Sequence, residues 1–166
     1  MSKSITCCFT GHRPKSLPWG YDEKGISYRK FKNKLRQKIR RAIKSGYEYF
    51  ISGMALGIDI IVAELVIELR KKHPNIKLEC AIPCLNQTIK WQEDSKERYE
   101  NILNNADKIS YVSNTSYFNG CMQKRNLYMI KQSSLLIAVF NGATGGTKST
   151  IELAHKRKLE IVIIKP

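Results

Sequence analysis

The chain has 166 residues, of which 42% are hydrophobic and 26% charged, with ten glycines and five prolines. This length is typical of one domain, and the composition excludes collagen-like, low-complexity and wholly disordered chains. No apolar run reaches the ~18 residues of a membrane span, and the N-terminus lacks the pattern of a secretion signal. We therefore expect a single domain over 1–166, located in the cytoplasm and without contact to a membrane.

The chain is strongly basic, and most of the excess charge lies in one segment. Lysine and arginine number 29 against 14 acidic residues, which gives a net charge of +15. Ten of these basic residues, and no acidic residue, lie between Lys24 and Lys44. This charge favours partners that carry phosphate or carboxylate groups.

The cysteines and histidines do not form a metal-binding pattern. The five cysteines are an odd number without a Cys-x-x-Cys pair, and the three histidines are scattered. Structural zinc sites need four ligands at suitable spacing. We expect small buried thiols and no metal.

Short β-rich segments alternate with helical segments along the chain. Strands are predicted over 5–10, 47–52, 77–82, 108–112, 135–140 and 160–164, and helices over about 27–45, 57–72, 94–105, 120–132 and 147–157. Several strands are nearly all apolar, as expected for parallel strands that are covered on both faces. The alternation predicts an α/β fold with a doubly wound, mainly parallel sheet flanked by helices.

Two of the helices have clear apolar surfaces. In the first, apolar residues recur every three or four positions, at Tyr28, Phe31, Leu35, Ile39 and Ile43. This face is predicted to cover the sheet while the basic residues face solvent. The second, over 58–69, is apolar nearly all round and is expected to be central. The segment 85–93 has no clean period and is predicted to be a loop or a short helix.

Three loops that follow predicted strands are the best candidates for a ligand site. In an open parallel sheet, ligands bind at the carboxyl ends of strands, near the switch in strand order. The first loop holds Thr10, Gly11, His12 and Arg13. Gly11 permits a close backbone approach, and His12 and Arg13 are donors to phosphate. A plain turn with a surface arginine is the alternative.

The second loop joins a strand to the apolar helix. It contains Ser52, Gly53, Met54, Ala55, Gly57 and Asp59. Two glycines at such a turn expose amide N–H groups at the positive end of a helix, which suits phosphate. Asp59 is either part of the site or a residue that matches the helix dipole. Glu64, inside the apolar helix, accepts from a ribose or base or else pairs with an arginine.

The third loop follows the most hydrophobic strand. It contains Asn141, Gly142, Thr144, Gly145, Gly146 and Thr147, and its glycines and hydroxyls make a phosphate cradle. Thr147 precedes Lys148 where a Walker A loop has glycine, which disfavours ATP hydrolysis by a P-loop mechanism. Neither glycine loop has the dinucleotide fingerprint spacing.

Two smaller features complete the predicted pocket. Pro83, Asn86 and Trp91 follow the third strand, where Asn86 or Trp91 would lie near a base. Arg125 and Asn126 lie on a predicted helix. Arg125 either reaches a phosphate or is an ordinary surface arginine.

The motifs resemble those of a known superfamily. The residues 52–59 resemble the Ser-Gly-x-Ala-x-Gly-Ile-Asp signature of the DNA-processing protein DprA (Smf), and 145–147 resemble the glycine-rich loop of Lonely Guy hydrolases. Both belong to the SLOG superfamily, which is Rossmann-like. The motifs Phe9–Pro14, Ala55–Asp59, Arg125-Asn126-x-x-Met129 and Gly142-x-x-Gly145-Gly146-Thr147 resemble its YpsA/YoqJ branch, in the same order, over essentially the whole chain.

The resemblance implies a pocket for a nucleotide-like ligand, such as an ADP-ribose derivative or NAD. Related SLOG domains of bacterial antiphage systems bind cyclic ADP-ribose signals, so a stand-alone protein of this kind would sense or sequester such a molecule without turnover and without a cofactor. Superfamily relatives often form dimers, which suggests a homo-oligomer by analogy.

Two alternative functions stay open. One is cleavage of a nucleotide N-glycosidic bond, for which Asp59 and Glu64 are the candidate catalytic groups. Against it, Thr150 stands where Lonely Guy enzymes have a glutamate, and Glu152 falls two residues later. The other is single-stranded nucleic-acid binding, as in DprA, through the basic helix 27–45. If the nucleotide site is right, Gly57→Glu or Thr147→Glu is expected to abolish binding and leave the fold intact.

Overall fold

The computed structural model describes residues 2–166, which contain one six-stranded parallel sheet. Its strands are β1 (Thr6–Gly11), β2 (Tyr49–Ser52), β3 (Lys77–Ile82), β4 (Lys108–Tyr111), β5 (Leu135–Val139) and β6 (Glu160–Ile164). The strand order is β4-β3-β2-β1-β5-β6. The chain builds outward from β1 to β4 and then crosses back to place β5 on the other side of β1. This confirms the predicted doubly wound, Rossmann-like α/β fold.

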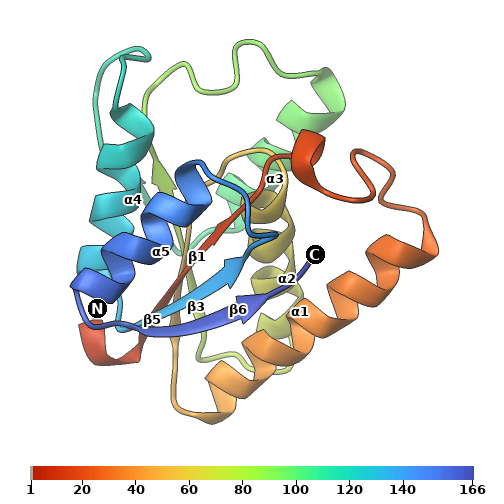
Figure 1. The fold of residues 1–166 in the computed structure, drawn as a ribbon, viewed down its shortest axis with the longest axis vertical. Coiled ribbons are helices and arrows are strands. Elements are labelled where there is room, and N and C mark those ends of the chain that lie inside the picture. Colours follow the sequence, from red (N-terminus) through yellow and green to blue (C-terminus); the bar gives the residue numbers. More distant parts are fainter. Residues whose placement is uncertain (1) are drawn as a thin grey trace.

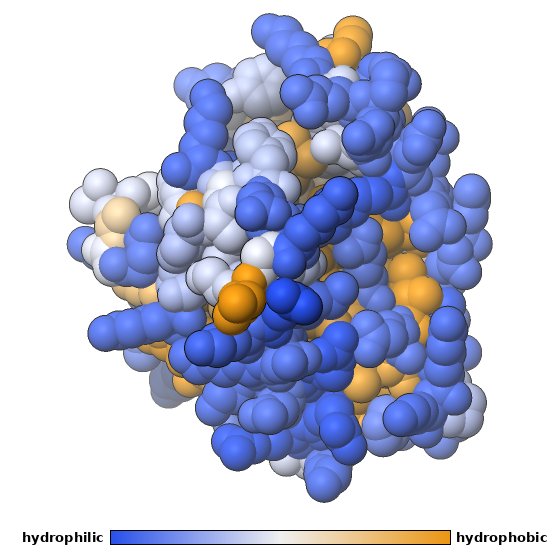
Figure 2. Space-filling model, turned by 90° about the vertical axis from the view of Figure 1, so that its right-hand side faces the viewer, coloured by the Kyte–Doolittle hydropathy of each residue, from blue (hydrophilic) through white to orange (hydrophobic). Residues whose placement is uncertain are grey.

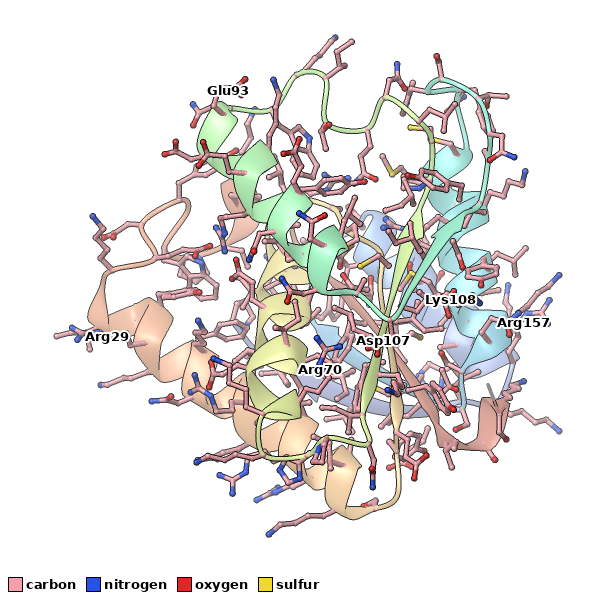
Figure 3. All side chains as sticks on the ribbon, turned by 180° about the vertical axis from the view of Figure 1, so that it is seen from behind. Arg29, Arg70, Glu93, Asp107, Lys108 and Arg157 are labelled. Carbon is pink, nitrogen blue, oxygen red and sulfur yellow. The ribbon has the colours of Figure 1, made fainter. Side chains whose placement is uncertain are left out.

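Helices cover both faces of the sheet. They are α1 (Ile26–Lys44), α2 (Ile58–Arg70), α3 (Glu93–Asn105), α4 (Cys121–Gln132) and α5 (Gly146–Lys156), with short 3-10 turns η1 (Lys3–Ile5) and η2 (Pro14–Ser16). Figure 1 shows α4 and α5 in front of the sheet, and Figure 3, from behind, shows α2 and α3 on the opposite face. Each predicted strand and helix is present, and 85–93 is mostly a loop of turns.

The apolar periodicities place the helices as predicted. On α1, Tyr28, Phe31, Leu35 and Ile39 are buried, and Ile43 packs partly buried against the same core. Helix α2 lies between α1 and α3, and most of its residues are buried, because it faces the sheet and both neighbouring helices. A second, smaller core lies under α4 and α5, on the other face.

The cysteines lie inside the fold, as the sequence predicts. All five cysteines are free and buried. Over residues 2–166, no three or more His, Cys, Asp or Glu side chains gather where they could hold a metal ion. None of the helices in this part of the chain is long and apolar enough to cross a membrane.

Candidate functional site

A cleft opens where the connections of the neighbouring strands β1 and β5 diverge. Gly11 of β1 lies beside Val139 of β5, and the chain leaves β1 toward α1 on one face and β5 toward α5 on the other. This switch point is where open α/β sheets bind ligands. The cleft has a volume of about 270 Å³. Its lining comprises Phe9, Thr10, Gly11, His12, Arg13, Ser16, Ala55, Asp59, Met122, Arg125, Asn126, Thr144, Gly145, Gly146 and Thr147.

The third loop presents a helix N-terminus to this cleft. Gly145 caps α5 with a φ of 136°, and Gly146 opens the helix. Both are exposed, and a Cβ atom at Gly146 would meet nothing within 4 Å. The first N–H groups of a helix lack intrahelical acceptors and carry the positive end of the dipole. With the exposed Arg13 on the same cleft, this end is suited to a phosphate group.

Asp59 and Arg125 form a buried ion pair at the base of the cleft. Arg125 Nη1 lies 3.3 Å from Asp59 Oδ2 and also donates to the Gly53 carbonyl, and Asp59 Oδ2 accepts from Ala55 N–H at 3.2 Å. Burial lowers the pKa of Arg125, and the Asp59 carboxylate opposes that shift. Arg125 is therefore no ordinary surface arginine. Asp59 pairs with it and so does more than match the dipole of α2. The pair joins α4 to the first turn of α2, and the Gly53 contact joins α4 to the loop before α2.

The rest of the second loop supports the cleft from below. Ser52 Oγ donates to the Asp59 carbonyl at 2.7 Å and accepts from Met54 N–H at 3.2 Å. Gly53 is packed so closely on Arg125 that a side chain there would overlap the guanidinium. Ser52, Gly53 and Met54 are buried and do not line the cleft.

Gly57 is a structural glycine, and the expectation that Gly57→Glu leaves the fold intact is wrong. Its φ is 95°, and a Cβ atom would lie 2.5 Å from the His12 carbonyl oxygen. That oxygen accepts from Ile58 N–H at 3.3 Å, so the contact joins the loop after β1 to α2. A side chain at position 57 would therefore disturb the fold, and loss of binding would not report on the site. Gly57 also lies outside the lining of the cleft.

His12 joins the first loop to the third. Its Nε2 accepts from Asn141 N–H at 3.1 Å, and its ring stacks on Phe140 with centroids 6.0 Å apart. Burial lowers the pKa of His12, which favours the neutral, accepting imidazole. Asn141 shapes its own loop, since its Oδ1 accepts from Ala143 N–H at 3.0 Å. Asn141 and Gly142 thus belong to the third loop but do not line the cleft.

The carboxylates considered for catalysis lie elsewhere or are paired. Glu64 forms two hydrogen bonds with Arg98, at 2.8 and 2.9 Å, outside the cleft, so the arginine alternative is correct. Thr150 Oγ1 accepts from Asn126 Nδ2 at 2.9 Å and donates to the Gly146 carbonyl at 2.8 Å. Glu152 pairs with Lys148 at 4.0 Å on the exposed side of α5. In residues 2–166, Asp59 is the one carboxylate that lines the cleft.

The segment after β3 forms a separate hollow next to the cleft. Asn86 and Trp91 line it, together with Tyr117 and Met122, whereas Pro83 is buried beside it. The sequence analysis missed Phe9, Ser16 and Met122 in the cleft. Met122 precedes Arg125 and Asn126 by three and four positions, so helical spacing could have identified it. Tyr117 lies in an irregular loop whose place no local pattern indicates.

These features define a Rossmann-like α/β protein with a glycine-rich polar cleft at the switch point of its sheet. The chain belongs to the YspA SLOG family, whose model, YpsA, matches residues 7–164. Among its relatives is a UPF0398 protein of Halalkalibacterium halodurans, 31% identical over 152 residues that cover 90% of this chain and 79% of the relative. Another is a UPF0398 protein of Bacillus thuringiensis, 32% identical over 154 residues that cover 92% and 83%.

Two solved structures of DNA processing protein A share the fold. That of Helicobacter pylori has a TM-score of 0.65 at 19% identity, covering 98% of this chain and 66% of the other. That of Streptococcus pneumoniae has a TM-score of 0.67 at 15% identity, covering 99% and 51%. The chain thus spans just under two thirds and about half of these proteins, and at such identities the likeness shows the fold alone.

Proposed function

We propose that the cleft binds a nucleotide-derived small molecule through its phosphate groups, and that the protein senses or sequesters this molecule. One observation carries the proposal: the exposed glycine amides at the N-terminus of α5 and the side chain of Arg13 line the same cleft. Helix N-termini and arginine are the main phosphate-binding devices of such folds. ADP-ribose, NAD and cyclic ADP-ribose are the first candidates, because the family resemblance implies ligands of this kind.

The arrangement of the cleft favours binding without turnover. Hydrolysis of a glycosidic bond commonly needs a free carboxyl group as an acid, base or nucleophile. Asp59 already accepts from Arg125 and Ala55, and Thr150 holds its hydroxyl between Asn126 and Gly146. The proposed binding role needs no cofactor.

The test adds one negative charge where the phosphate is expected. Gly146→Asp places a carboxylate in open space at the first position of α5. Two like charges ~4 Å apart at an effective dielectric constant of ~20 repel by ~4 kcal/mol before screening. We expect binding of ADP-ribose, measured by calorimetry, to weaken about tenfold or more.

The matched control is Gly146→Asn, which has the same shape without the charge. We expect the Asn variant to retain most of the affinity, and the Asp variant to melt no lower than the Asn variant, because an acidic residue suits a helix N-terminus. Equal affinity of the Asp variant and the wild type would place the phosphate elsewhere. Mass spectrometry of the free and the heat-released ligand distinguishes binding from hydrolysis. A ligand of unchanged mass supports a sensor, and a product of new mass supports a hydrolase.

Single-stranded nucleic-acid binding is the second candidate. The printed title of the Helicobacter pylori structure describes single-stranded DNA binding by that protein. In the present chain, the basic residues of α1 give an extended surface of one sign, and Figure 2 shows the largely hydrophilic face on this side of the molecule. Such a surface binds phosphate backbones without reading sequence.

A further inference from the structure

A second hollow lies next to the cleft, beside the first turn of α4. It has a volume of about 400 Å³, and its walls are formed by Trp91, Tyr117 and Ile89 with the polar residues Asn86, Gln87 and Lys90. Met122 lines both the hollow and the cleft. The cleft and the hollow therefore adjoin at Met122, and a ligand long enough to pass this side chain would occupy both. The residues proposed to bind phosphate, Arg13, Gly145 and Gly146, do not line this hollow.

The hollow exposes apolar side chains although contacts hold their loops in place, and Trp91 is partly buried. Tyr117 is 62% exposed and Ile89 is 68% exposed. The Tyr117 N–H donates to Asn86 Oδ1 at 2.7 Å, which ties the loop before α4 to the loop after β3. Trp91 is held edge-on against Tyr99, with centroids 5.4 Å apart. Exposed aromatic surface on fixed loops is suited to a flat apolar group that stacks on it.

Gln87 connects the hollow to the loop between β2 and α2. Its Nε2 donates to the Met54 carbonyl, which fixes the side chain in the wall. Its Oε1 is buried and has no hydrogen-bond partner within residues 2–166. A buried acceptor without a partner carries a desolvation cost that a donor of a ligand would remove. The hollow thus combines aromatic faces with one unused acceptor.

We infer that this hollow takes the planar, amino-bearing base of a nucleotide whose phosphate groups occupy the cleft. The base stacks on Trp91 or Tyr117, and its exocyclic amine donates to Gln87 Oε1. This inference rests on the proposed function and assigns the base of its ligand to the hollow, with a base that bears an exocyclic amine. Ribose phosphates without a base would use the cleft alone.

Tyr117→Ala tests the inference against Tyr21→Ala, another largely exposed tyrosine that lies outside both the cleft and the hollow. Stacking of a base on an aromatic side chain corresponds to roughly 5- to 150-fold in affinity. We expect Tyr117→Ala to weaken ADP-ribose binding within this range and to leave ribose 5-phosphate binding unchanged. Tyr21→Ala is expected to change neither. AMP is expected to bind tighter than IMP, which has an oxygen in place of the amine, and Gln87→Leu should remove that preference.

Trp91 gives an independent readout in the unmodified protein. We expect ADP-ribose, but not ribose 5-phosphate, to change its fluorescence, while the buried Trp19 contributes a constant background. If ADP-ribose binds no tighter than ribose 5-phosphate, or Tyr117→Ala affects both equally, the hollow is not a base site. The proposed function then stands as long as Gly146→Asp still weakens binding of ribose 5-phosphate. If neither compound binds the wild type, the proposed function fails, and this inference with it.

Discussion

His12 holds the first and third loops together only while it is neutral. A protonated Nε2 cannot accept from the Asn141 N–H, and burial lowers the pKa of His12 in the folded chain. The unfolded chain therefore binds this proton first as the pH falls. The stabilising contribution is complete above the unfolded pKa of about 6.5 and is lost as the pH falls through the lower folded value.

The variant His12→Gln tests this contact, because its Oε1 can accept from Asn141 but does not titrate. We expect the difference between the melting temperatures at pH 7.5 and pH 5.5 to be smaller in His12→Gln than in the wild type. His155→Gln, on the exposed side of α5, is the control and should keep the wild-type difference. An unchanged pH response in His12→Gln would show that the His12–Asn141 hydrogen bond does not couple stability to pH.

At the scale of the elements, Asp107 joins three segments at the edge of the sheet away from the cleft. Its Oδ2 accepts from Arg70 of α2 at 2.6 Å and from the Leu78 N–H of β3 at 2.8 Å, directly after α3. Figure 3 shows Arg70 and Asp107 side by side behind the sheet. Burial raises the pKa of Asp107, but the Leu78 hydrogen bond and the charges of Arg70 and Lys77 outweigh it and lower the pKa overall.

Replacing Asp107 with Asn removes this charge and keeps the shape. Hydrogen bonds to charged groups contribute ~1.5–3 kcal/mol, so we expect Asp107→Asn to lower the free energy of unfolding by ~2 kcal/mol in urea. The contribution is complete above the unfolded pKa of about 3.9 and is lost as the pH falls through the lower folded pKa. Glu100→Gln, on the exposed side of α3, should stay within ~0.5 kcal/mol of the wild type. Equal effects of the two changes would contradict the role of Asp107.

The sequence predicted the elements better than the contacts between them. Apolar periodicity is local, so the burial of Phe31 and Leu35 on α1 followed from spacing alone. The three loops also met as expected, since the carboxyl ends of parallel strands share one edge. Arg125 remained ambiguous, because its partner Asp59 lies 66 positions away in the chain. Gly57 was misread because the His12 carbonyl that crowds it also comes from another element.

On the scale of the whole molecule, the charge is distributed unevenly around the fold. Helix α1 carries most of the excess on its outer face, and Arg36 with Glu68 is the one ion pair of α1 within residues 2–166. Figure 3 shows Arg29 of α1 and Arg157, beyond α5, on opposite sides of the molecule. A polyanion would therefore approach the α1 side first, whereas a small phosphate ligand needs the cleft. The two candidate functions thus use different surfaces of one protein.

This separation can be tested with charge reversals of equal size. The double variant Arg40→Glu, Lys44→Glu changes the exposed C-terminal end of α1, and Lys156→Glu, Arg157→Glu changes the exposed C-terminal end of α5 by the same charge. If α1 binds single-stranded nucleic acid, the first variant should weaken binding of a labelled oligothymidine, measured by fluorescence anisotropy. Its salt dependence should also fall, by about 0.7 in slope for each lost phosphate contact.

The second variant and Gly146→Asp should leave oligothymidine binding close to the wild type, because neither alters α1. A loss in Gly146→Asp alone would instead place the strand in the cleft, in competition with the nucleotide. Equal losses in both double variants would mean that only the net charge of +15 attracts the strand. Since α1 runs along the outside of the sheet and the cleft lies at its carboxyl edge, these results separate a nucleic-acid surface from a small-molecule site.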